Sequence, residues 1–115
     1  MKTTVTAKSV ALITLFVFGC THSPSITESE VIKAINNFFS ALDVEKFDRN
    51  RVADLVTNDF RIYEMENDFT LEQFFEYIDN QSQGLTSTSW ELSNYTGSTD
   101  EHSAHVHYSN KGEFM

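Results

Sequence analysis

The sequence predicts an α+β domain in which helices come first and an antiparallel meander follows. Apolar residues recur at helical spacing after Thr27 and again after Thr70, and each threonine opens a capping box. Residues 60–65, 89–95 and 102–109 are rich in strand formers instead. Short polar turns separate the last strands, which favours an antiparallel arrangement beside the helices.

The first expected helix begins at Thr27 and ends near Leu42. Its apolar face consists of Val31, Ile35, Phe38, Phe39 and Leu42. A second, shorter helix follows the capping residue Asp48, carries Val52, Leu55 and Val56, and is broken by residues 57–59.

The rest of the chain alternates strands, turns and one more helix. We expect a strand at 60–65, a turn at 66–68, a helix from Thr70 to about Asn80 and a polar loop at 81–87. A strand at 89–95, a turn at 96–100, a strand at 102–109 and a turn at 110–112 then lead into the last three residues. The expected core comprises Phe38, Leu42, Leu55, Phe74, Phe75 and Trp90, with Ile35 and Ile78 beside them.

Residues 1–19 have the pattern of a signal peptide. A basic start with Lys2 and Lys8 precedes an apolar run from Val10 to Phe18, which is too short to span a bilayer. Val17, Gly19 and Cys20 resemble the lipobox of bacterial lipoproteins, in which the cysteine is lipidated. An ordinary secretory signal or an uncleaved anchor with an incidental cysteine is the alternative.

This resemblance implies a location in the bacterial cell envelope. Thr21, rather than Asp, after the cysteine implies the outer membrane, with the protein held by its lipid anchor and facing the periplasm. We therefore divide the chain into a signal peptide (1–19), a tether (20–26) and one domain (27–115).

The charge of the chain excludes one class of partner. The net charge is −9 over 115 residues, and removing the two leader lysines makes the mature chain about −11. Such a surface repels nucleic acid. Cys20 is the single cysteine, so neither an internal disulfide nor a cysteine metal site is expected.

The middle of the chain resembles the nuclear transport factor 2-like superfamily, which includes SnoaL-like cyclases and ketosteroid isomerases. The resemblance depends on residues 39–43, 47–48 and 53–60. They follow the order of the superfamily's first two helices and first strand: an aromatic residue before Ala-Leu, then Leu-Asp, then an Asp-rich stretch. The resemblance implies a cone of three helices packed on a curved antiparallel sheet around a pocket. It also implies two further strands, in the middle of the sheet, beyond Met115. We therefore expect an unpaired sheet edge near 102–109 and a C-terminally incomplete domain.

The isomerases of this superfamily need a carboxylate base and a tyrosine donor. The resemblance carries the base onto Glu64, but it carries the tyrosine onto Phe38, which has no donor. Half of that machinery is therefore missing, and Glu64 is either a pocket carboxylate or an ordinary strand residue.

His105 and His107 lie two residues apart and share one face of the expected strand. Three roles remain open for them: metal binding with a third ligand among residues 100–102, acid–base chemistry in a pocket, or simple exposure. Ala104, Val106 and Tyr108 take the opposite face, which looks like the core side. No nucleophile motif, phosphate loop or metal-binding helix appears, so we expect no metal and no cofactor.

Three aromatic residues on strands, Tyr63, Trp90 and Tyr95, are candidates for the lining of a ligand cavity or for core packing. The leading hypothesis is a non-catalytic binding or accessory module that takes a small apolar ligand. One alternative is an enzyme in which Glu64, His105 or His107 transfers a proton. Another is an assembly subunit that forms a homodimer through its sheet.

Overall fold

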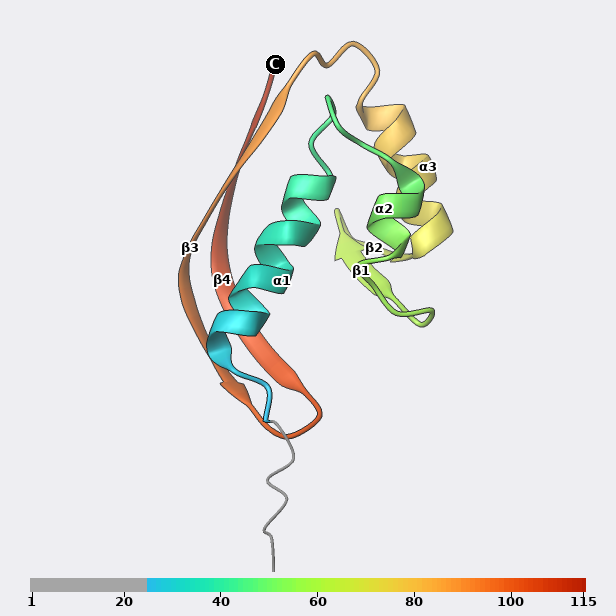
Figure 1. The fold of residues 1–115 in the computed structure, drawn as a ribbon. Coiled ribbons are helices and arrows are strands. Elements are labelled where there is room, and N and C mark those ends of the chain that lie inside the picture. Colours follow the sequence, from blue (N-terminus) through green and yellow to red (C-terminus); the bar gives the residue numbers. More distant parts are fainter. Residues whose placement is uncertain (1–24) are drawn as a thin grey trace, which may run out of the picture.

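The computed structural model describes residues 25–115, and their fold is α+β as the sequence predicts (Figure 1). The helices are α1 (Glu28–Ala41), α2 (Arg49–Ala53) and α3 (Leu71–Gln81). The strands are β1 (Arg61–Glu64), β2 (Asn67–Thr70), β3 (Thr88–Thr99) and β4 (Ala104–Phe114). No helix within residues 25–115 has the length and apolar character needed to cross a membrane.

Both predicted capping boxes are present. The Thr27 hydroxyl accepts from the Glu30 amide, and the Glu30 carboxylate accepts from the Thr27 amide at 2.9 Å. Thr70 and Gln73 form the same reciprocal pair at the start of α3. These bonds satisfy amides that a helix start otherwise leaves free, which is why both helices begin where the sequence indicates.

Helix α2 is shorter than expected, and this corrects the predicted core. Asp48 caps it by accepting from the amides of Asn50 and Arg51 at 2.8 and 3.1 Å. The helix ends at Ala53, so Leu55 falls after the last turn and is 43% exposed instead of buried.

The predicted turn at 66–68 is wrong because the chain reverses earlier. Met65 and Glu66 form a two-residue hairpin turn with φ of 47° and 66°, and β2 follows at once. The side-chain amide of Asn67 donates to the Met65 carbonyl at 2.8 Å, and Arg61 pairs with Asp68 across the two strands. Turns of this kind usually contain Asn and Gly, so the sequence gives little warning of this one.

The predicted turns at 96–100 and 110–112 are also wrong, since residues 96–99 lie inside β3 and residues 110–112 lie inside β4. A Cβ on Gly97 would approach the His105 carbonyl oxygen to 2.2 Å, and one on Gly112 would approach the Trp90 ring to 2.9 Å. These glycines are therefore not turn residues. Their missing side chains leave room for atoms of the neighbouring strand. The real turn follows Asp100, whose carboxylate accepts from the amides of His102 and Ser103.

A β-bulge bends the β3–β4 hairpin. Ser93 pairs with Ser109 and Thr96 with His107, so Asn94 and Tyr95 together oppose Tyr108. Asn94 adopts a positive φ of 55°, which asparagine tolerates better than most residues. The extra residue reverses the alternation, so Tyr95 faces α1, where its hydroxyl oxygen accepts from the Asn36 amide at 3.1 Å.

The buried core lies among the helices. Its five residues are Ala41, Leu42, Val52, Phe74 and Phe75, and half-buried side chains such as Phe38 and Trp90 pack against it. The expected single curved sheet is replaced, within residues 25–115, by two separate two-stranded sheets, β1–β2 and β3–β4.

Candidate functional site: an aromatic cavity between helices and hairpin

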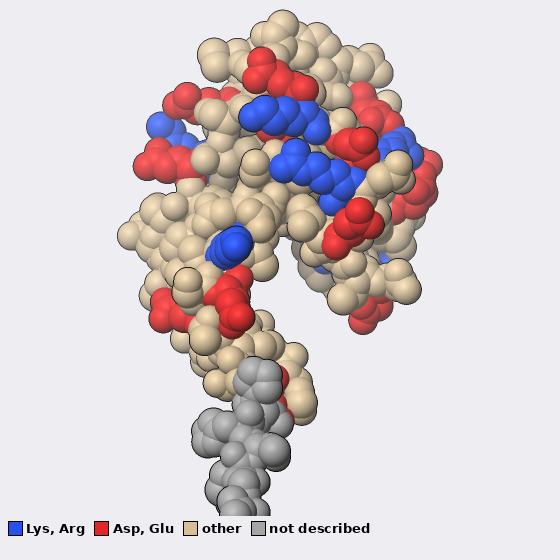
Figure 2. All heavy atoms as spheres, in the orientation of Figure 1, with Lys and Arg blue, Asp and Glu red and all other residues tan. Residues whose placement is uncertain are grey.

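A cavity of about 810 Å³ opens between the helices, the β1 strand and the β3–β4 hairpin. Figure 1 shows α1 lying along the inner side of the curved hairpin, with α2 and α3 on the other side of α1. The space-filling view shows the molecule hollowed between the arm that carries the β3–β4 hairpin and the part that carries β1–β2 (Figure 2). This volume is within the range of small-molecule sites in proteins.

Aromatic residues are the largest group in the cavity wall and make up nearly half of it. They come from α1, the segment before α2, β1, α3, β3 and β4: Phe38, Phe39, Phe47, Tyr63, Phe74, Tyr77, Trp90, Tyr108 and Phe114. Aliphatic side chains fill the spaces between them: Leu42, Val44, Ile62, Ile78 and Leu85. Such a lining favours an apolar occupant, because each buried ring offers a large apolar surface.

Trp90 is held by rings on both of its flanks. Its ring centroid lies 5.4 Å from that of Phe39 on α1 and 5.4 Å from that of Phe114 on β4. Gly112, opposite Trp90 in the hairpin, leaves the space that the indole fills. The buried indole N–H finds no acceptor within residues 25–115, which leaves this wall short of one hydrogen bond.

A small polar cluster attaches the start of β3 to the helices. The Thr88 hydroxyl donates to the Asp43 carboxylate at 3.2 Å and accepts from the Val44 amide at 2.9 Å. Both bonds are partly buried, and they join residues more than forty positions apart. They fix the end of the hairpin at which Trp90 enters the cavity.

The Tyr108 hydroxyl belongs to the β4 wall. Partial burial raises the pKa of Tyr108 above its ordinary value, and the neighbouring Tyr95 adds to the increase. Tyr108 is therefore a neutral hydroxyl at physiological pH, able to donate or accept a hydrogen bond.

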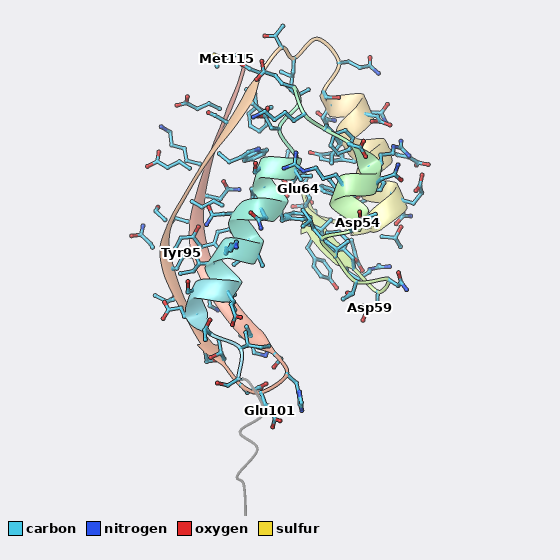
Figure 3. All side chains as sticks on the ribbon, viewed as in Figure 1. Asp54, Asp59, Glu64, Tyr95, Glu101 and Met115 are labelled. Carbon is cyan, nitrogen blue, oxygen red and sulfur yellow. The ribbon has the colours of Figure 1, made fainter. Side chains whose placement is uncertain are left out.

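The predicted site residues within the described chain lie on three different surfaces. Glu64, Tyr63 and Trp90 line the cavity. Tyr95 lies in a separate pocket of about 70 Å³ beside Glu28 and Ile32 on α1. Figure 3 shows this separation, with Glu64 at the end of β1 and Tyr95 out on the hairpin.

His105 and His107 lie on the outer face of β4 and are exposed. The half-buried residues Ala104 and Val106 alternate with them on the inner face. Neither histidine is among the cavity-lining residues, and residues 25–115 contain no group of three or more His, Cys, Asp or Glu placed to hold a metal. Glu64 and these histidines are thus on different surfaces.

Sequence reasoning missed most of the cavity wall. Phe114 and Leu85 were assigned to a chain end and to a polar loop, and Tyr77 was not placed on the apolar side of its helix. The useful signal was the alternation of side chains beyond Ser109, because it shows that β4 continues to Phe114. One face of this strand carries Val106, Tyr108, Asn110, Gly112 and Phe114. Gly112, next to Asn110 and Lys111, resembles a turn residue and made this strand look shorter than it is.

Comparisons with known proteins add no relative. No family model, no curated protein and no solved structure matches the chain. The predicted lipidation residue Cys20 lies outside the described residues.

Proposed function

We propose that the domain is a non-catalytic module that binds a small apolar ligand in the aromatic cavity. The cavity itself, with about 810 Å³ of space and a wall made largely of aromatic and aliphatic side chains, carries this proposal. An enzyme of the kind considered above needs a base and a partner on the same surface. The lining contains Glu64 and the tyrosines Tyr63, Tyr77 and Tyr108 but no imidazole. Glu64 is exposed to solvent and has no base partner of that kind beside it, so the proposal includes no chemical step.

A neutral apolar dye, N-phenyl-1-naphthylamine, tests the binding proposal. We expect its fluorescence to rise on binding, and we expect Leu85→Asp to weaken binding at least about tenfold, because a carboxylate in an apolar wall must be desolvated when the dye binds. Leu55→Asp is the matched control, since Leu55 is 43% exposed and does not line the cavity. Equal dye binding by the two variants would contradict the proposal.

We also propose that the module is held in the bacterial envelope through a lipid on Cys20. The basic start, the short apolar run and the Gly19–Cys20 pair support this part of the proposal. Cys20→Ser should move the protein from the membrane fraction to the soluble periplasmic fraction. A Cys20→Ser protein that stays with the membrane would point to an uncleaved anchor.

For the fold, we propose the cone of the nuclear transport factor 2-like superfamily. Three helices, a bent antiparallel hairpin and a cavity between them support it. The resemblance places further strands in the middle of the cone's sheet, and β1–β2 and β3–β4 lie as separate hairpins on either side of the cavity. An experimental structure with β1 or β2 paired directly to β4 would overturn this assignment.

A further inference from the structure

The lining of the aromatic cavity carries negative charge and no positive charge. Glu64 is the single charged residue of the lining, and the lining contains no Lys, Arg or His. An anionic ligand would therefore meet a carboxylate and no cation. The whole chain, with a net charge of −9, acts in the same direction.

Glu64 differs from the acids of its hairpin and of α3 that form ion pairs. Asp68 on β2 pairs with Arg61, and Asp79 on α3 pairs with Arg49. Within residues 25–115, Glu64 has no ion-pair partner and is exposed. Its charge is thus uncompensated at the point where β1 meets the cavity (Figure 3).

The rings of the wall favour the same sign of ligand charge. The faces of Trp, Tyr and Phe carry partial negative charge and attract ammonium groups, and such sites recognise quaternary ammonium ligands. Trp90, Phe39 and Tyr108 form one contiguous set, with Phe39 5.4 Å from Trp90 and 5.9 Å from Tyr108 between ring centroids. The hydroxyl of Tyr108 adds a neutral acceptor rather than a positive group.

Building on the binding function proposed above, we infer that the preferred ligand is an apolar molecule with one cationic ammonium group. The apolar body lies among the aromatic rings, and the ammonium group lies near Glu64. Anionic amphiphiles such as fatty acids are disfavoured by the same arrangement.

Three compounds with the same apolar chain test this inference: octyltrimethylammonium, octanol and octanoate. Binding is measured by calorimetry and by the fluorescence of Trp90, the only tryptophan of the chain. At low salt we expect the cation to bind about three- to tenfold more tightly than the alcohol, and the carboxylate to bind most weakly. Added salt should reduce the difference, because Glu64 is exposed to solvent.

Substitutions at Glu64 separate its effect from that of the overall charge. Glu64→Gln should remove most of the preference for the cation over the alcohol, because the affinity for the cation falls much more than the affinity for octanol. Glu64→Lys should make octanoate bind more tightly than the cation. Glu76→Gln is the matched control, because Glu76 is an exposed acid on α3 outside the lining, and it should leave the preference intact.

The possible results distinguish this inference from the proposed function. If none of the three compounds binds, the binding function fails, and the ligand class fails with it. If all three bind with equal affinity, the binding function stands and the ligand class is wrong. A preference for the cation that survives Glu64→Gln would overturn the role of Glu64.

Discussion

The helical end and the β3–β4 hairpin are packed to different degrees. All five buried hydrophobic residues of the described chain lie in the helices or at their ends, and neither sheet contributes one. The inner face of the hairpin is only half covered, with Tyr108 38% and Phe114 59% exposed. The helical end therefore supplies the stability, while the hairpin leaves apolar surface open for the cavity.

The polar interactions show the same difference. Arg49 joins α2 to α3 through Glu72 and Asp79, and its guanidinium lies 5.3 Å from the ring centroid of Phe75. On the hairpin side, the Trp90 indole N–H is left without an acceptor within residues 25–115. A buried donor without an acceptor costs free energy, so the hairpin side is the less well satisfied of the two regions.

The largest difference in stability is expected between two phenylalanine truncations, one in each region. Phe75→Ala should lower the free energy of unfolding by about 3–5 kcal/mol, because Phe75 is 4% exposed and packs against Phe47. Phe114→Ala should cost less than about 1.5 kcal/mol, because that side chain is already 59% exposed. Urea unfolding measures both, and equal losses would contradict the difference between the two regions.

Gly97→Ala should have the next largest effect. The new methyl group would meet the His105 carbonyl oxygen at 2.2 Å, so the hairpin backbone must shift, at a cost of about 1–3 kcal/mol. Gly84→Ala is the comparison, because it meets no atom within 4 Å and is opposed only by a φ of 86°. A thermal melting temperature for Gly97→Ala at or above that of Gly84→Ala would show that the strands do not approach as closely as described.

The β1–β2 turn should respond in the opposite direction. Glu66 has a φ of 66°, a conformation that costs a residue with a side chain about 1–2 kcal/mol. Glu66→Gly should therefore raise the free energy of unfolding by about 1 kcal/mol, whereas Glu66→Ala should give no such gain. A destabilised Glu66→Gly protein would argue against this turn.

A smaller effect is expected from acid. Hydrogen bonds from His102 and Ser103 lower the pKa of Asp100, and the bond from Arg61 lowers that of Asp68. Carboxylates with a lowered pKa add stability above their ordinary value near 4, and this stability is lost as the pH falls through the lowered values. The melting temperature should thus decrease below about pH 4. Asp100→Asn should show a shallower decrease, and an identical pH profile would remove Asp100 from this account.

The sequence predicted the helices well because their signals are local. A capping box, a capping aspartate and an apolar repeat act within a few residues, so Thr27, Asp48 and Thr70 mark helix starts without reference to the rest of the chain. The class of the fold and the burial of Phe74 and Phe75 follow from those patterns.

The strands were harder to predict because their limits depend on distant partners. Gly97 and Gly112 look like turn residues until His105 and Trp90 are placed against them. Tyr95 changes face only because a bulge, opposite Tyr108, precedes it. The cavity was missed in part for the same reason, since most of its β4 wall lies beyond the predicted strand end.

Amide hydrogen exchange with and without a bound ligand tests the central claim most directly. In the free protein we expect the amides of β3 and β4 to exchange faster than those of α3, because the hairpin contributes no buried side chain. Saturating octyltrimethylammonium should slow exchange around Trp90 and Tyr108 and leave α2 nearly unchanged. Equal protection of both regions in the free protein, or a ligand effect confined to the outer face at His105 and His107, would contradict the account.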